Sequence, residues 1–353
     1  MIARFLSRGS TCAGLLAAAW TCYLVTPALA QVEKPNIKIT LDWAFQGPQS
    51  IFTLAEARGY FKREGIDVTI DRAAGTNETV VRVASGAYDF GWADFPTMVK
   101  FNAVNPDQRL IGVYMSGDKS PNSIMSIKGR GIEKPEDLVG KTLGSTAGSA
   151  ANAMFPLFAD KVGIDASKVQ WKMVSGALRE PMLARGEVDG VAGFLTSSVM
   201  SLVELGIPQE DIVIMNYNDF GLKQYGTVLW AKAEFVEKNP KTVAAVVRAY
   251  NQALKDAIAD PDASVATLKA RDGLLNLANE CRRLLIALDL TMTPYYKEHG
   301  LSSVDSERLA QSIAEIRRVF GYKDEITNDS VFTDAFLPPK ADRIPPTPSS
   351  CKS

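Results

Sequence analysis

Histidine and cysteine are scarce in this chain. Its 353 residues include one histidine, His299, and four cysteines, two of which fall in the first thirty positions. A single imidazole excludes any site that needs two histidines, and no set of cysteine and histidine residues has the spacing of a zinc site. We therefore expect neither a metal nor an organic cofactor. Most metal sites and most catalytic triads that contain histidine are not expected either.

An excess of one sign of charge is also missing. The chain has 39 Lys and Arg against 40 Asp and Glu. Nucleic-acid-binding surfaces need clustered positive charge, so we expect no nucleic-acid partner. With 46% hydrophobic residues, the composition is that of a globular chain long enough for one large or two medium domains.

Apolar runs long enough to span a bilayer are absent from the sequence. Residues 1–30 contain two positive charges, then an apolar run over 13–25 and a small-x-small sequence at 28–30. This pattern is typical of a secretory signal peptide, so we expect residues 31–353 to be exported to the periplasm. No cysteine follows the expected cleavage site, and we expect no lipid anchor there.

Cleavage would leave Cys281 and Cys351 in an oxidising compartment, where a disulfide could persist. A bridge between them would tie the C-terminal tail to a helix. Two free thiols are the alternative, and the sequence leaves both open. A cysteine nucleophile is not favoured, because the only histidine is distant in the sequence.

Strand and helix patterns alternate from position 37 onward, and the same order recurs about a hundred residues later. This order predicts two similar α/β lobes with parallel sheets covered by helices. Internal symmetry and the ordinary repetition of strand–helix units both explain the recurrence. The first series is expected at 37–41, 50–58, 67–70, 76–86 and 89–92, and the second at 141–144, 149–161, 169–174 and 179–184. A return strand at 226–230 and C-terminal helices at 239–254, from 260, 274–288 and 305–320 follow.

Ligands of open parallel sheets bind outside the carboxyl ends of the strands, where loops lead into helix N-termini. The loop 42–49 offers aromatic rings, a carboxylate and amides, whereas the loop 144–152 offers hydroxyls and free N–H groups. Helix capping is the structural alternative for the polar residues, and core packing is the alternative for Trp43. The candidate contacts are Asp42, Trp43, Gln46, Gln49, Thr76, Asp94, Phe95, Ser145, Thr146, Gly148 and Ser149, with Asp219 and Tyr225 as wall residues.

Five motifs have a distinctive spacing: Leu41-Asp42-Trp43, Gly59-Tyr60-Phe61-x-x-Glu64-Gly65, Gly86-x-x-Asp89-x-Gly91, Pro135-Glu136-Asp137-Leu138 and Gly186-x-x-Asp189-Gly190. With them the chain resembles the solute-binding proteins of the thiamine-pyrimidine-synthesis-like superfamily over nearly its whole exported length. That superfamily includes ATP-binding cassette (ABC) receptors for thiamine pyrimidine precursors, nitrate, bicarbonate, taurine and alkanesulfonates.

The resemblance implies a type II periplasmic-binding-protein fold. Two α/β lobes would be joined by two crossover strands, near 122–127 and 226–230, and the C-terminal helices would pack on the first lobe. The expected ranges are 31–124 with 228–341 for the first lobe, 125–227 for the second lobe and 342–353 for a flexible, proline-rich tail.

The resemblance further implies a receptor, not an enzyme, that traps a small solute and delivers it to the permease and ATPase of an ABC importer. We expect Trp43 to stack on a planar portion of the solute. Asp42, Gln46 and Asp94 would bind its polar edge, and Ser145, Thr146 and Ser149 would hold an anionic or carbonyl end. The loops that carry these residues contain no Arg or Lys, which favours a heteroaromatic or carboxylated solute over bare nitrate.

Two alternatives stay open: a pyrimidine-synthesis-like enzyme on the same fold, and a sensor that presents its bound solute to a membrane receptor. The eukaryotic pyrimidine synthases of this superfamily carry a sacrificial histidine after the Leu-Asp-Trp motif, together with a cysteine-rich motif. Here an ungapped alignment puts Gln49 at the histidine position, and there is no cysteine cluster. Pyrimidine receptors also tend to have an acidic residue in the second lobe, and none lies between Asp189 and Glu204.

Overall fold

The computed structural model describes residues 1–2 and 31–352, so all but two residues of the expected signal peptide lie outside the described residues. In the described part of the chain, no helix combines the length and apolar content that a bilayer crossing requires.

The strands of the described residues form two five-stranded sheets, in the orders β2-β1-β3-β10-β4 and β7-β6-β8-β5-β9. We refer to the two sheets with their helices as the first and second lobes. The strands are β1 (Asn36–Leu41), β2 (Asp67–Arg72), β3 (Phe90–Asp94), β4 (Leu110–Met115), β5 (Asn122–Ile127), β6 (Thr142–Ser145), β7 (Gln170–Met173), β8 (Gly190–Phe194), β9 (Ile212–Asn216) and β10 (Thr227–Lys232).

Both sheets are mixed, and the expectation of wholly parallel sheets is wrong. The pairs of β1 with β2 and β3 and of β6 with β7 and β8 are parallel as expected. However, β10 runs antiparallel to β3 and β4, and β5 runs antiparallel to β8 and β9. The reason is the crossover: each of these strands arrives from the other lobe and enters its sheet from the carboxyl edge of the neighbouring strands.

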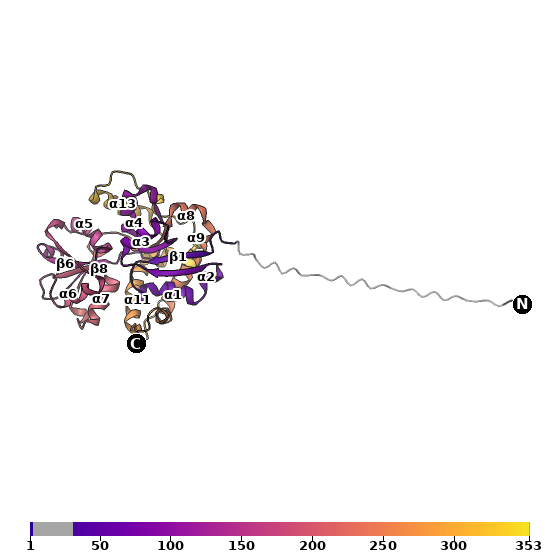
Figure 1. The fold of residues 1–353 in the computed structure, drawn as a ribbon, viewed down its shortest axis with the longest axis horizontal. Coiled ribbons are helices and arrows are strands. Elements are labelled where there is room, and N and C mark those ends of the chain that lie inside the picture. Colours follow the sequence, from indigo (N-terminus) through magenta and orange to yellow (C-terminus); the bar gives the residue numbers. More distant parts are fainter. Residues whose placement is uncertain (3–30, 353) are drawn as a thin grey trace. The chain divides into compact units, whose positions relative to one another are not determined.

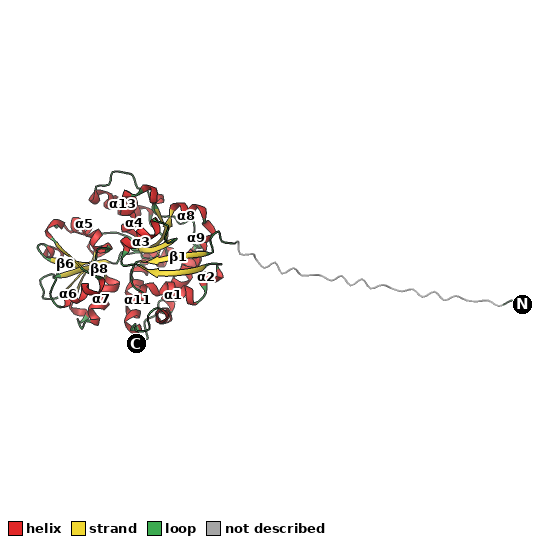
Figure 2. Cartoon of the chain, viewed as in Figure 1, coloured by secondary structure: helices red, strands yellow, loops and turns green. Residues whose placement is uncertain are grey.

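Helices cover both faces of each sheet. Figure 2 shows α5 on one face of the second sheet and α6 and α7 on the other. The helices are α1 (Ser50–Ala57), α2 (Tyr60–Arg63), α3 (Thr76–Ala84), α4 (Phe95–Val104), α5 (Ala150–Val162), α6 (Gly176–Ala184), α7 (Leu195–Glu204), α8 (Ala233–Lys238), α9 (Pro240–Ala259), α10 (Pro261–Ala266), α11 (Leu277–Thr291), α12 (Pro294–His299), α13 (Ser306–Phe320) and α14 (Lys340–Arg343).

The C-terminal helices pack on the first lobe, as expected. In Figure 1 the first lobe combines indigo and orange segments, whereas the second lobe is magenta, because the chain leaves the first lobe and later returns to it. One core cluster joins β1 and α1 to α9 and α11 through residues such as Phe52, Tyr250 and Leu284. The rings of Phe52 and Tyr250 lie 4.8 Å apart between centroids, so the returning segment completes the first hydrophobic core.

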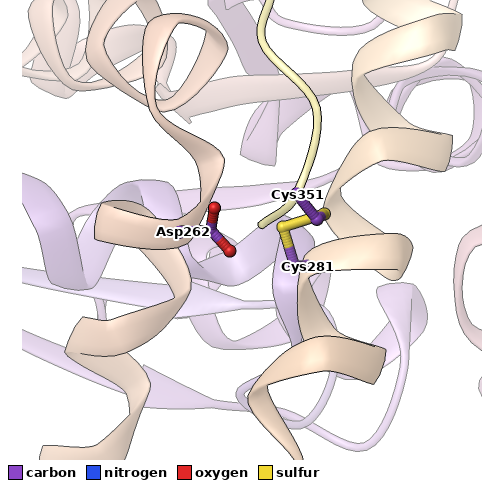
Figure 3. A group of neighbouring side chains, drawn as sticks. All are labelled: Asp262, Cys281 and Cys351. Carbon is purple, nitrogen blue, oxygen red and sulfur yellow. A yellow bond between two sulfur atoms is a disulfide. The ribbon is translucent and has the colours of Figure 1, made fainter. Parts of the chain in front are cut away.

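A disulfide joins Cys281 of α11 to Cys351, which decides the alternative that the sequence left open. Figure 3 shows the bridge beside the carboxylate of Asp262. Because both sulfur atoms are bonded to each other, this group offers no thiolate to a metal. The tail has further anchors, since the N–H groups of Ser349 and Lys352 donate to Ile258 O at 3.1 Å and to Asp262 Oδ2 at 2.8 Å.

Candidate functional site

A pocket lies between the two lobes at the carboxyl ends of their strands. Its volume is about 460 Å³, counted with the part open to solvent. The sequence places polar residues there because β1, β6 and β8 end at its rim and α3, α5 and α7 begin at it. Of the candidate contacts, Asp42, Trp43, Gln46, Gln49, Thr76, Thr146, Gly148 and Ser149 line this pocket.

Trp43 reaches across the pocket from the first lobe to the second. Its side chain is half-buried and comes so close to Gly176 that a Cβ atom there would lie 2.5 Å from the indole Cη2. Glycine at the start of α6 therefore makes room for the ring. The indole forms a flat apolar wall of the pocket that a planar group could stack against.

Asp42 and Gln49 form the polar floor on the first-lobe side. Asp42 is 3% exposed, and Gln49 Nε2 donates to its Oδ1 at 3.0 Å. Burial raises the pKa of Asp42 from 3.8 to about 7, against the lowering effect of that hydrogen bond. In the described residues Gln49 Oε1 and Tyr250 Oη are buried without a partner, and a second cavity, which shares Asp42 and Gln49 with the pocket, contacts both side chains. These atoms can serve a solute or a water that enters from the pocket.

The second lobe contributes hydroxyl groups and a helix N-terminus. Thr146 Oγ1 is buried and has no partner among the described residues. Ser149 caps α5, and its side chain accepts from Asn152 N at 3.3 Å. The lobes also touch here, because a Cβ atom on Gly75 would lie 2.7 Å from the carbonyl oxygen of Gly148. Glycine at position 75 therefore permits this close approach of the two lobes.

Asp94 does not line the pocket. It caps α4, accepting from the N–H and hydroxyl of Thr97 at 3.0 and 2.6 Å, and it accepts from Asn122 Nδ2 at 2.9 Å. Burial raises the pKa of Asp94 from 3.8 to about 6, against these hydrogen bonds. Because Asn122 begins β5, the Asp94 carboxylate ties the end of β3 to the start of a crossover strand.

Four more candidate contacts also lie outside this pocket. Phe95 and Tyr225 are buried and pack edge to face, with ring centroids 6.3 Å apart. Ser145 is buried, and its hydroxyl donates to Ala192 O at 3.4 Å. Asp219 is exposed. A position at the end of a strand therefore does not by itself bring a side chain to the pocket.

The sequence interpretation missed the contribution of α6 and of the β8–α7 junction, which adds Arg179, Gly193, Phe194, Thr196 and Ser197 to the lining. It also missed the fixed positive charge, because Arg179 lay in an expected helix and not in a loop. The recurrence of the two series could have indicated this junction, because β8 leads directly into α7 in the same way as β3 leads into α4. Arg179 lies close to the tryptophan, with its Cζ 5.7 Å from the ring centroid of Trp43.

Helix α11 bridges the lobes beside the pocket. Glu280 Oε2 accepts from Gly47 N at 2.7 Å in the loop of the first lobe. Arg283 donates to Glu280 Oε1 at 3.2 Å. It also donates to two residues of α7, to the carbonyl oxygen of Ser197 and, at 2.9 Å, to Glu204 Oε2. Since Ser197 also lines the pocket, this network connects closure of the lobes with the pocket wall.

The comparisons with known proteins agree with this architecture. A family model described as NMT1/THI5 like matches residues 49–264. The 4-amino-5-hydroxymethyl-2-methylpyrimidine phosphate synthase of Schizosaccharomyces pombe is 27% identical over 217 residues, which cover 59% of this chain and 61% of the synthase. The match therefore spans less than two thirds of that relative. The formylaminopyrimidine-binding protein of Halalkalibacterium halodurans is 26% identical over 235 residues, 66% of this chain and 69% of the relative.

Solved structures show the same fold. The alkanesulfonate-binding protein SsuA from Xanthomonas axonopodis pv. citri, bound to MOPS, superimposes with a TM-score of 0.65 at 19% identity, covering 85% of this chain and 99% of that protein. The periplasmic nitrate-binding protein NrtA from Synechocystis PCC 6803 gives 0.61 at 13% identity, covering 90% and 93%. The fold is thus that of periplasmic binding proteins, and by the match over most of its length the chain belongs to the NMT1/THI5 like family.

Proposed function

We propose that this protein is the extracytoplasmic solute-binding receptor of an ABC importer, and that it traps a planar heteroaromatic or carboxylated solute between its lobes. The observation that carries the proposal is the pocket itself, which both lobes line and which faces the Trp43 indole with polar groups from each side. Membership of a family with binding-protein relatives supports it.

The proposed organisation follows from the same account. Residues 1–30 direct export to the periplasm, residues 31–124 with 228–341 form one lobe, and residues 125–227 form the other. The solute closes the lobes by a hinge motion, and the closed form docks on a membrane permease that works with a cytoplasmic ATPase. Asp94 acts at the hinge through Asn122 in this scheme.

The pocket residues have distinct proposed roles. Trp43 stacks on the ring of the solute, and Asp42 with Gln49 binds its polar edge at the floor of the pocket. Thr146, Ser149 and the first turn of α5 receive a carbonyl or anionic group.

The similarity to a pyrimidine phosphate synthase raises an enzyme as the second candidate. Gln49 supports the receptor proposal, because its amide lies in the pocket, hydrogen-bonded to Asp42, and an amide neither transfers protons nor attacks carbon as an imidazole does. Turnover of a bound solute, followed by mass spectrometry, would establish the enzyme instead.

A thermal-shift panel tests the proposal. Residues 31–353 are refolded after ligand removal and heated with pyrimidines, thiamine, purines, aromatic carboxylates, sulfonates, taurine and nitrate. A solute with micromolar Kd at millimolar concentration adds about 4 kcal/mol of stability. We expect a response that Trp43→Ala abolishes and that Tyr322→Ala, which changes a half-buried ring outside the pocket, leaves intact. A folded protein that responds to nothing in the panel contradicts the proposed solute class.

A further inference from the structure

Arg179 has unused hydrogen-bond donors at the wall of the pocket. The residue lies in the first turn of α6 with 4% of its surface exposed. Its Nε donates to Glu180 Oε1 at 2.8 Å, and its Nη2 donates to Ser198 Oγ at 2.9 Å. Within residues 31–352, the third nitrogen, Nη1, has no acceptor at hydrogen-bond distance. A guanidinium that is nearly buried and keeps free N–H groups at a pocket wall is suited to an acceptor that enters from outside.

The position of the guanidinium is fixed from two directions. A Cβ atom on Gly193 would lie 2.8 Å from both Cζ and Nη1 of Arg179, so the plane of the side chain rests against the backbone at the end of β8. From the other lobe, the Trp43 ring centroid is 5.7 Å from Cζ. Arg179 is therefore placed beside the ring that is proposed to stack on the solute.

Three helix N-termini and a hydroxyl group add further donors to the pocket wall. Helices α3, α5 and α7 all begin at the pocket, and the N-cap residues of α3 and α7, Gly75 and Phe194, supply no side-chain cap. The hydroxyl of Thr146 is buried without a partner in the described part of the chain. Helix N-termini carry positive partial charge, so these groups and Nη1 together favour an acceptor with negative charge.

Glu180 explains how a nearly buried arginine is tolerated at the pocket wall. The two side chains are 5% and 4% exposed, with Nη2 and Oε1 2.7 Å apart. The pair neutralises the charge, as a nearly buried arginine requires. Its contacts use Nε and Nη2, so the pairing leaves Nη1 available.

We propose that Arg179 is a specificity-determining residue, and that the solute trapped by the pocket is a planar ring bearing a carboxylate, which accepts from Nη1. The inference rests on the proposed receptor function and further specifies that the solute carries a negative charge.

Matched pairs of solutes test the inference by titration calorimetry on the ligand-stripped chain. The pairs are benzoate with benzamide, nicotinate with nicotinamide and orotate with uracil, with benzenesulfonate as a separate arm. A charge-assisted hydrogen bond in a water-poor site predicts that at least one acid binds roughly tenfold or more tighter than its neutral partner.

Variants then assign the preference to Arg179. Arg179→Gln should remove the difference between acid and neutral partner while changing the affinity of the neutral partner much less. The double variant Arg179→Gln with Glu180→Gln leaves no unpaired buried carboxylate, and it should give the same loss if the single variant does not fold. Gly193→Ala should weaken the acid too, because its methyl group displaces the guanidinium. Arg185→Gln removes an exposed arginine at the end of α6, paired with Glu187, and is the matched control.

The outcomes separate the inference from the receptor function. Tighter binding of the neutral partners, or an acid preference that survives both Arg179 variants, overturns the inference and leaves the receptor intact. Stronger binding of benzenesulfonate than of benzoate overturns the carboxylate assignment. Absence of binding by every ring in a folded protein overturns the inference together with the proposed solute class.

Discussion

Asp42 shows how the pocket changes the chemistry of a single residue. Its carboxyl group is buried beside Gln49, near the second buried acid Asp94, and burial raises its pKa to about 7. In the unfolded chain it titrates near 3.8. Between pH 3.8 and about pH 7 the folded state binds a proton at Asp42 that the unfolded state has lost. The free energy of unfolding is therefore highest, as far as Asp42 is concerned, below about pH 4, and it falls as the pH rises to about 7.

Replacing Asp42 by Asn should therefore make the ligand-free protein more stable at about pH 8, since no buried charge must form there. The rise from 3.8 to about 7 sets an upper limit of roughly 4 kcal/mol for the gain. The gain should shrink toward pH 4, where the wild-type carboxyl is protonated. Urea denaturation across this range measures it.

The charge of Asp94 also raises the pKa of Asp42, so the replacement removes this repulsion together with the buried carboxylate. A gain that does not change with pH would mean that Asp42 is ionised in the folded protein, contrary to the effect of its burial.

At this scale the sequence indicates which loops lie at the carboxyl ends of strands. Asp42 and Trp43 come after an alternating strand pattern, and both line the pocket. Arg179 could not be found in this way, because its place depends on packing against Gly193 and on the approach of the other lobe. Asp94 lies at the carboxyl end of a strand, as expected, but its carboxylate accepts hydrogen bonds from Thr97 and Asn122 and does not line the pocket.

Helix α11 connects the two lobes through hydrogen bonds to both. Arg283 is buried, and its bonds beyond Glu280 go to α7 of the second lobe. Burial also raises the pKa of Glu280, against the opposing effect of the Arg283 charge. Burying the charges of Arg283 and Glu280 therefore costs free energy unless each group keeps its partners.

Arg283→Ala should destabilise the protein by about 3–5 kcal/mol, because it leaves Glu280 buried without its partner. The double variant Arg283→Met with Glu280→Gln removes both charges and should recover most of this loss. Urea denaturation at neutral pH measures both. Equal destabilisation by the single and double variants would show that lost packing, and not the unpaired charge, is responsible.

Element boundaries were predictable where proline and glycine mark them. The helices expected to start at 239 and 260 begin at Pro240 and Pro261, and α5 ends before Gly163, whose φ is 75°. The direction of β5 and β10 was not predictable from local patterns. It depends on the chain crossing between lobes, which no window of the sequence contains.

For the whole molecule, the disulfide between Cys281 and Cys351 closes a loop of 70 residues. A cross-link of that length restricts the unfolded chain and stabilises the folded state by about 4 kcal/mol in the chain-entropy model. Cys351→Ser should lower the melting temperature accordingly. A reductant should lower it equally in the wild type and have no further effect on the variant.

If the wild type in reductant matches the oxidised wild type, the bridge contributes nothing to stability. The sequence named both cysteines but could not pair them, because their proximity comes from the fold of the tail along α10 and α11.

The most direct test of the central claim is a crystal structure of residues 31–353 with the solute that stabilises them most. We predict one solute molecule between the lobes, with its ring against the Trp43 indole and its polar groups facing Asp42 and Thr146. Another groove lies on the first lobe beside His299, Phe332 and Arg343. A solute bound in that groove, with the interlobe pocket occupied only by water, would contradict the account.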